Sequence, residues 1–156
     1  MDHIAEWKRL KVQGVRNDHL EIKESPGKGM GVFTRRDIAE GEAIEYCHAI
    51  VLDWKKKYIG DAQIRRYAWW SGCSCEDCKK HGDRALIALG YGAIYNSADK
   101  EEEANAANHI HTNDSLLVFT AKRPIKAGEE ILVWYGQAYL DFWCRKPAVD
   151  SGGASV

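Results

Sequence analysis

The sequence lacks an excess of charge of either sign. Lysine and arginine together number 22, and aspartate and glutamate 23, so the formal net charge is −1 and the isoelectric point is near 6.6. Proteins that hold nucleic acid by its phosphates carry a basic surface or stripe. This composition gives no such electrostatic signal, and we expect no direct nucleic-acid partner.

Long apolar runs are also missing. None approaches the roughly 20 residues that a membrane-spanning helix needs, and residues 1–6 lack the basic-then-apolar order of a secretory signal. Cysteines number 5, an odd count, and in a chain that looks intracellular metal binding or free thiols are expected rather than a disulfide framework. These absences predict a soluble, intracellular protein without membrane contact.

The length and composition are those of one globular domain. Its 156 residues, 45% hydrophobic and 29% charged, suffice for a single core. The sequence shows no internal repeat and no interdomain linker. We predict an N-terminal arm or short helix over 1–17, a domain over 18–146 with a cysteine-rich insert near 71–83, and a flexible tail over 147–156.

Short strands separated by glycine-containing turns dominate the pattern. Alternating or β-branched segments of this length are typical of strands. They cover residues 19–23, 32–34, 43–47, 49–52, 115–121 and 131–135. The pattern predicts a β-rich fold, mainly β with short helices and barrel-like in character.

Three segments resemble, in order and spacing, the motifs of the SET-domain protein-lysine N-methyltransferases. The first is the glycine loop 27–33, the second runs over 90–98 and on to Asn105, and the third covers 125–136. The likeness extends over roughly residues 18–143. It implies a compact SET-type β-fold whose C-terminal segment is threaded to form the active site.

The second motif departs from the family's usual Asn-His-Ser-Cys. Here it reads Asn96-Ser97-Ala98, and Asn105 follows an acidic insert. This form, with the ending 132–136, is similar to the PR-type branch of the family. Some members of that branch methylate lysine, and others have little demonstrated activity.

The resemblance implies transfer of a methyl group from S-adenosylmethionine to a lysine ε-amine of a protein or peptide substrate. Two alternatives stay open. One is a catalytically silent SET/PR-like module that binds a partner protein, and the other is a small zinc-binding interaction domain.

The same resemblance implies a cofactor site. Glycine lets the backbone approach a ligand closely, and the loop lacks the Walker A ending and the Rossmann spacing, so a nucleotide triphosphate or dinucleotide is not expected. The implied cofactor-binding residues are Lys28, Gly29, Met30, Gly31, Asn96, Ser97, Tyr135 and Trp143. Whether Phe142 or Trp143 covers the adenine or simply packs is left open.

Tyr135 is the implied catalytic residue. Its hydroxyl would orient the amine and stabilise the polarised methyl through weak C–H···O contact. An apolar aromatic channel would lower the pKa of the substrate ammonium by desolvation and attract it by cation–π contact while it is charged. The expected channel residues are Tyr67, Tyr95 and Trp134, although plain packing is the alternative for each.

The cysteine-rich insert has the close spacing of metal ligands. Cys73, Cys75 and Cys78 followed by His81 predict a tetrahedral zinc site. Cys144 or Cys47 are alternatives for the fourth ligand. A solvent-facing loop of free thiols is the competing interpretation, so zinc is left open beside S-adenosylmethionine.

Overall fold

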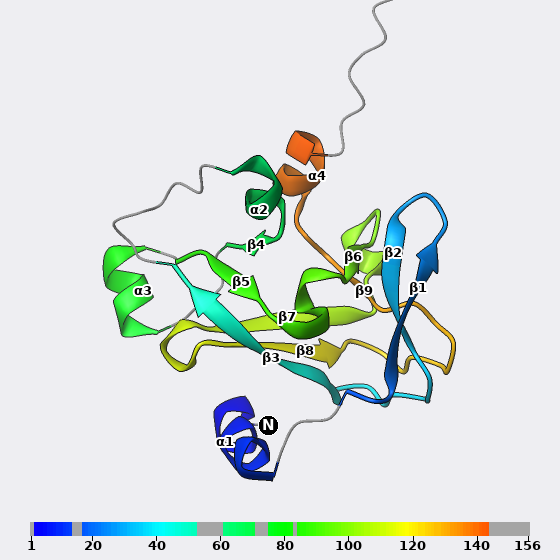
Figure 1. Cartoon of the computed structure of the whole chain (residues 1–156), viewed down its shortest axis with the longest axis horizontal. Coiled ribbons are helices and arrows are strands. Elements are labelled where there is room, and N and C mark those ends of the chain that lie inside the picture. Colours follow the sequence, from blue (N-terminus) through cyan, green and yellow to red (C-terminus); the bar gives the residue numbers. More distant parts are fainter. Residues whose placement is uncertain (1, 14–16, 53–60, 71–74, 83, 144–156) are drawn as a thin grey trace, which may run out of the picture.

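The computed structural model describes residues 2–13, 17–52, 61–70, 75–82 and 84–143, with the backbone alone at 11–13, 142 and 143. It is β-rich with short helices, as the sequence predicts (Figure 1). The strands are β1 (Leu20–Ser25), β2 (Gly29–Thr34), β3 (Ala43–Val51), β4 (Ala68–Trp69), β5 (Leu86–Ala88), β6 (Asn96–Ser97), β7 (Ala106–His111), β8 (Leu116–Ala121) and β9 (Leu132–Val133). The α-helices are α1 (His3–Gln13), α2 (Ala62–Arg66), α3 (Glu76–His81) and α4 (Gln137–Trp143), and short 3-10 turns lie at Gly90–Ala93, Glu101–Glu103 and Thr112–Asp114. Every helix in these described ranges is too short or too polar to cross a bilayer.

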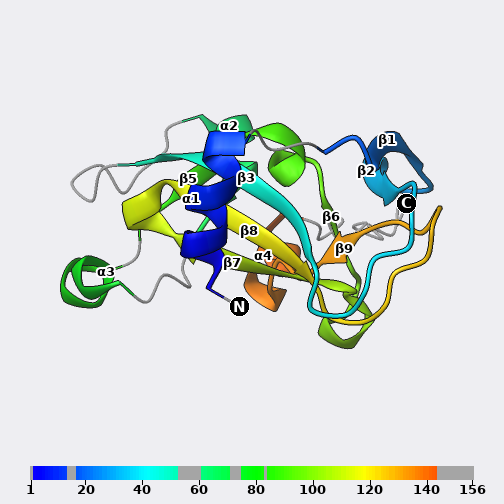
Figure 2. The same ribbon diagram turned by 90° about the horizontal axis from the view of Figure 1, so that it is seen from below.

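The largest sheet has five strands in the order β4-β5-β3-β8-β7, with antiparallel neighbours. Helix α1 lies across one face of it (Figures 1 and 2). There Trp7 stacks on Tyr46 with ring centroids 6.2 Å apart, next to the buried Leu116 and Val118. Because α1 covers this face and the main core covers the other, β8 is buried along its whole length.

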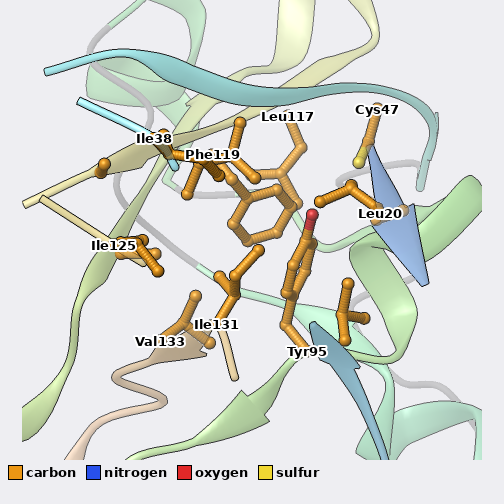
Figure 3. Packing of buried hydrophobic residues seen from close by; sticks show 14 of the residues in the cluster. Leu20, Ile38, Cys47, Tyr95, Leu117, Phe119, Ile125, Ile131 and Val133 are labelled. Atoms are coloured by element: carbon orange, nitrogen blue, oxygen red, sulfur yellow. The ribbon is translucent and has the colours of Figure 1, made fainter. Parts of the chain in front are cut away.

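The main core lies on the opposite face of the sheet (Figure 3). Phe119 of β8 packs against the fully buried ring of Tyr95, with centroids 4.4 Å apart. Ile131 and Val133, from the C-terminal motif, are buried in the same cluster. Burial of apolar surface of this kind is the main favourable term in folding, so the C-terminal motif is an integral part of the core.

The C-terminal segment is threaded between other elements. Residues 128–131 run beside β2, with the N–H of Ile131 donating to the carbonyl of Val32 at 2.8 Å. Strand β9 then pairs in parallel with β6. The N–H groups of Ala98 and Asn105 donate to the carbonyls of Val133 and Leu132, so both ends of the 98–105 connection are bonded to β9.

Three details differ from the sequence-based expectation. The described strands form three separate sheets and no closed barrel. Residues 29–31, expected in a loop, belong to β2, and the strand expected over 131–135 is confined to β9 because its partner β6 has two residues. The segment before residue 18 contributes the packed helix α1.

Candidate active site

Asn96 and Ser97 lie where the glycine-rich hairpin meets the C-terminal motif. The side-chain amide of Asn96 donates to the carbonyl of Met30 at 3.1 Å and to Oε1 of Glu130 at 2.9 Å. The hydroxyl of Ser97 accepts from the N–H of Tyr135 at 3.3 Å. The structure therefore brings residues of all three motifs together through these two neighbouring side chains.

Glu130 fixes the hairpin to this point. Its carboxylate also accepts from the hydroxyl of Ser25 at 2.8 Å, so it connects the end of β1, next to the hairpin turn, to Asn96. A Cβ built on Gly31 would collide with Oε1 of Glu130 and lie 2.9 Å from Nδ2 of Asn96. The close approach explains the glycine at 31. Sequence reasoning treated Glu130 only as part of a turn and missed its role at this site. The pair of acidic residues directly after Gly128 was the feature that could have pointed to it.

The turn of the hairpin leaves its main chain open. Gly29 has φ of 80°, a conformation that side chains rarely adopt, and nothing lies within 4 Å of where its Cβ would be. Beside it, Nζ of Lys28 donates to the carbonyl of Ser97 at 2.8 Å and lies 3.2 Å from the carboxylate of Asp99. An exposed backbone flanked by a cation and the amide of Asn96 fits the carboxylate and amine of S-adenosylmethionine, which needs close main-chain approach and polar partners.

Tyr135 links this polar side to an aromatic cavity on its other side. Its main chain bonds Ser97, and its hydroxyl donates to the carbonyl of Tyr95. Its ring meets Trp69 and Tyr139 edge to face, at centroid distances of 5.4 and 4.8 Å. These contacts fix the position of the phenol.

The cavity has a volume of about 700 Å³. Its wall is mainly aromatic, contributed by Tyr67, Trp69, Trp70, Trp134, Tyr135 and Tyr139. Indole Nε1 of Trp69 donates to the carbonyl of Gly92 at 3.2 Å, and the hydroxyl of Tyr139 donates to the carbonyl of Arg66 at 3.0 Å. The polar atoms of Trp69 and Tyr139 are thus bonded to the protein, and these two rings present carbon atoms to the cavity.

Tyr95 occupies a different place from the one expected. Its ring is fully buried in the core and does not line the cavity, and only its carbonyl oxygen reaches Tyr135. This corrects the expectation that its ring forms a channel wall. The reason is its packing on Phe119 and the hydrogen bond from its hydroxyl to Glu45 at 2.8 Å.

Glu45 is a buried carboxyl that sequence reasoning missed. It accepts from the hydroxyl of Tyr95, the N–H of Tyr91 at 3.1 Å and the amide of Asn17 at 2.9 Å. Burial raises its pKa above the ordinary value, more than these hydrogen bonds lower it. Residue 45 lies on the same face of β3 as the buried Cys47 and Ala49, but no pattern in the sequence marks that face as the core.

Of the other expected site residues, Tyr67 and Trp134 line the cavity, and Tyr67 is 54% exposed. Trp143 ends α4, and its side chain lies outside the described residues, as does that of Phe142. Membership of the cofactor site therefore stays a prediction for Trp143.

The cysteine cluster is described only in part. Cys73 lies outside the described residues. The sulfurs of Cys75 and Cys78 lie 3.5 and 3.4 Å from Oγ1 of Thr112, so both thiols converge on one point. His81 ends α3 and is exposed. Among the residues with described positions, no group of three potential ligands could hold a metal ion, and the zinc site stays a prediction.

Comparisons with known proteins agree with this geometry. The family described as SET domain matches residues 29–136. No protein with a curated description matches the sequence.

Two solved structures illustrate the likeness. A Plasmodium falciparum protein described as a candidate histone methyltransferase is 27% identical, with a TM-score of 0.58, covering 76% of this chain and 97% of that one. The methyltransferase domain of human PR domain-containing protein 2 has a TM-score of 0.53 at 18% identity, covering 84% of this chain and 85% of that one, and shows the shared fold. With a family match over most of its length and all three motifs meeting at Ser97 and Tyr135, the chain belongs to the SET domain family.

Proposed function

We propose that this protein transfers a methyl group from S-adenosylmethionine to the ε-amine of a lysine in a protein substrate. The observation that carries the proposal is the position of Tyr135. Its main chain is bonded to Ser97 on the side of the glycine hairpin, and its ring stands in the wall of the aromatic cavity. A donor held by the hairpin and an amine held in the cavity would meet at this residue.

When bound, S-adenosylmethionine would supply an activated methyl: the carbon–sulfur electron pair would stay on sulfur, and the lone pair of the amine would form the new carbon–nitrogen bond. This donor would be bound by Lys28, by the exposed backbone at Gly29, and by Asn96 and Ser97. Main-chain contact accounts for much of such a site, so Ser97 in place of the family's histidine is compatible with it. The proton released from nitrogen goes to water.

The aromatic wall would select and prepare the acceptor. A lysine chain is apolar up to its terminal nitrogen, so its methylene groups fit between rings. Removal of the ammonium from water lowers its pKa, which raises the fraction of neutral amine able to attack. The hydroxyl of Tyr135 and the carbonyl of Tyr95 that it contacts would orient that amine.

Two measurements test the proposal. Titration calorimetry with S-adenosylmethionine should show binding, and mass spectrometry of a peptide and protein library incubated with enzyme and cofactor should show methylated lysine. Cofactor binding without methylation of any library member would favour a silent interaction module. Absence of both would overturn the proposal.

The cysteine-rich insert carries a second, separate proposal. We infer that Cys73, Cys75 and Cys78 bind zinc, with His81 as the expected fourth ligand, because two of these thiols already converge beside Thr112. Elemental analysis of purified protein should find about one zinc per chain. Absence of zinc after preparation in zinc-containing medium would support the alternative interpretation, a segment of free thiols.

A further inference from the structure

The segment 90–95 is bonded to one buried carboxylate, that of Glu45 on β3. Glu45 is 2% exposed. Its Oε1 accepts from the N–H of Tyr91 at 3.1 Å, and its Oε2 accepts from the hydroxyl of Tyr95 at 2.8 Å. Figure 3 shows that this hydroxyl lies on the side of the core where Cys47 of β3 stands. Residues near both ends of the segment are therefore held by the same side chain.

The backbone of this segment also lies directly against β3. Gly90 has φ of 74°, and a Cβ built on it would lie 2.8 Å from Oε1 of Glu45. A Cβ built on Gly92 would lie 2.8 Å from Sγ of Cys47. The glycines permit this close approach, and the segment has little room to move towards the strand.

Two carbonyl groups of the same segment hold residues of the aromatic cavity. The carbonyl of Gly92 accepts from Nε1 of Trp69 at 3.2 Å, and that of Tyr95 accepts from the hydroxyl of Tyr135. The rings of Trp69 and Tyr135 meet edge to face at 5.4 Å, and both line the cavity. A shift of the segment would therefore displace both rings.

The burial of Glu45 needs a reason, because removing a carboxyl group from water is costly unless it is hydrogen-bonded. Besides Tyr91 and Tyr95, it accepts from the side-chain amide of Asn17 at 2.9 Å. A buried polar network whose groups are satisfied fixes one arrangement of the core. What the carboxyl group of Glu45 provides here is a fixed position of the segment 90–95.

We propose, on the basis of the methyl transfer proposed above, that Glu45 is a positioning residue for that reaction. It acts through Tyr95, whose hydroxyl it binds and whose carbonyl holds the hydroxyl of Tyr135. Its contribution is to the transfer step and not to the binding of S-adenosylmethionine or of the acceptor.

Tyr95→Phe is the first test, because it keeps the ring and the carbonyl and loses only the hydroxyl bonded to Glu45. With a peptide that the wild type methylates, we expect kcat to fall by about tenfold, since small misplacements of a reacting group are costly. The KM values for peptide and cofactor should stay within about twofold. All assays are run well below the Tm of every variant.

Substitutions of Glu45 itself test the carboxyl group. Glu45→Ala removes the partner of both Tyr91 and Tyr95 and should lower kcat at least as far as Tyr95→Phe does. Glu45→Gln retains an acceptor and should recover part of the loss. If Glu45→Ala does not fold, Tyr95→Phe and Glu45→Gln still decide the question.

Two further variants distinguish positioning from plain stabilisation. Val118→Ala leaves a cavity on the α1 face of the sheet, opposite the core that contains Tyr95, so it should lower Tm and leave kcat unchanged. Tyr95→Phe combined with Tyr135→Phe should be no slower than Tyr135→Phe alone, because residues that act through one group are not additive.

A measurement without cofactor reports the position of Tyr135 directly. In protein labelled with ¹³Cζ-tyrosine, the NMR signal of Tyr135 is identified by its loss in Tyr135→Phe. It should shift in Tyr95→Phe and keep its position in Val118→Ala.

The outcomes separate the two proposals. If the wild type methylates nothing, the proposed function fails, and the Tyr135 signal alone decides for or against positioning. An unchanged kcat in Tyr95→Phe overturns the inference and leaves the methyl transfer standing. Additive losses in the double variant, or an equal fall of kcat in Val118→Ala, also overturn it, because Glu45 would then only stabilise the fold.

Discussion

Tyr135 is the single residue on which the proposed chemistry depends. Its hydroxyl contacts the carbonyl of Tyr95, and its ring is wedged between Trp69 and Tyr139. In Tyr135→Phe the ring contacts remain and only the hydroxyl is lost. We expect kcat to fall by about a hundredfold, as for loss of one well-placed polar group in an active site, while calorimetry shows unchanged cofactor affinity.

Tyr46→Phe is the matched control, because it removes a phenol hydroxyl on the α1 face of the sheet. It should leave kcat unchanged. Equal methyl incorporation by wild type and Tyr135→Phe over the peptide and protein library would remove Tyr135 from the mechanism.

Glu45 is expected to make stability depend on pH. Its carboxyl is buried and its folded pKa is raised, so the folded state holds its proton to higher pH than the unfolded state does. The stabilisation is therefore full below the unfolded pKa, near 4.5, and is lost as pH rises through the folded value. Glu45→Gln cannot titrate at this position, so its free energy of unfolding, measured by urea denaturation from about pH 5 to 8, should change less with pH than that of the wild type. The difference in slope is at most about 1.4 kcal/mol per pH unit for one proton.

The amide of glutamine can still accept from Tyr91 N–H and face the hydroxyl of Tyr95, so the variant should fold. Parallel stability profiles for wild type and Glu45→Gln would mean that Glu45 does not titrate in this range. Methyl transfer can be measured on the same samples, because Tyr95 touches both Glu45 and Tyr135.

Glu45 and Tyr95 also show what a sequence leaves undetermined about single residues. The motif places Tyr95 beside Asn96 but does not say which way its ring points, and the core on Phe119 decides that. In β3 both faces are buried between residues 44 and 47, since α1 covers one of them. The segment therefore shows no alternation of polar and apolar residues that would have marked Glu45 as a buried carboxylate.

Among the elements, the β1–β2 hairpin is positioned by its contact with β6 and the start of the C-terminal motif. A side chain at residue 31 has no room, because Glu130 and Asn96 occupy that space. We expect Gly31→Ala to lower the free energy of unfolding by about 1–3 kcal/mol, the usual cost of overpacking, and to weaken S-adenosylmethionine binding. Urea denaturation and calorimetry measure the two effects.

Glu24→Ala is the control for this variant, because Glu24 is exposed and pairs with Met30 on the neighbouring strand. It should leave cofactor affinity as in the wild type. Full affinity and stability in Gly31→Ala would show that the hairpin adjusts freely and is not held by Glu130.

Helix α1 is expected to loosen from the sheet in acid. His3 lies 5.0 Å from His109 and 6.3 Å from His111 between ring centroids, and burial lowers the pKa of all three. Asp2 and Asp114 oppose the shift at His111 without reversing it. The folded state thus disfavours protonated imidazoles, and the stabilisation present above about pH 6.5 is lost as pH falls through the folded values.

Hydrogen exchange tests this at the level of the helix. Protection of the α1 amides should fall between about pH 7.5 and 5.5, after correction for intrinsic exchange, while β8 stays protected. His3→Gln, which lacks one titrating ring, should reduce the fall. Equal protection of α1 at both pH values would contradict the prediction.

For the whole molecule, the arrangement of the three motifs was the most predictable feature. Their resemblance to the motifs of SET-domain proteins implied that the glycine loop, Asn96 and Tyr135 meet, and the structure brings residues of all three motifs together. The extra contacts of the C-terminal segment with β2 follow from long-range packing, which periodicity does not report. Nor did any local pattern show that α2 brings Arg65 and Arg66 to the cavity, since the approach depends on Tyr139, far along the chain.

Cofactor binding should stabilise the entire fold. The proposed site draws on the β1–β2 hairpin, β6 and the segment around β9, so a ligand would bind the folded state and not the unfolded chain. At a concentration about a hundred times its Kd, S-adenosylmethionine should add about 2.7 kcal/mol to the free energy of unfolding and raise Tm. ATP, which shares the adenine, should leave Tm unchanged; an equal shift with ATP would point to a general adenine site.

The parallel pairing of β6 with β9 also dictates an order of events during synthesis. Asn96 and Ser97 leave the ribosome well before Leu132 and Val133, their partners in the ladder. A nascent chain that stops short of residue 131 can already close the β1–β2 hairpin, whereas the segment 96–98 still lacks its neighbour. Binding of the methyl donor should therefore appear only after β9 has left the ribosome and paired with β6. It should not increase gradually with the length of the nascent chain.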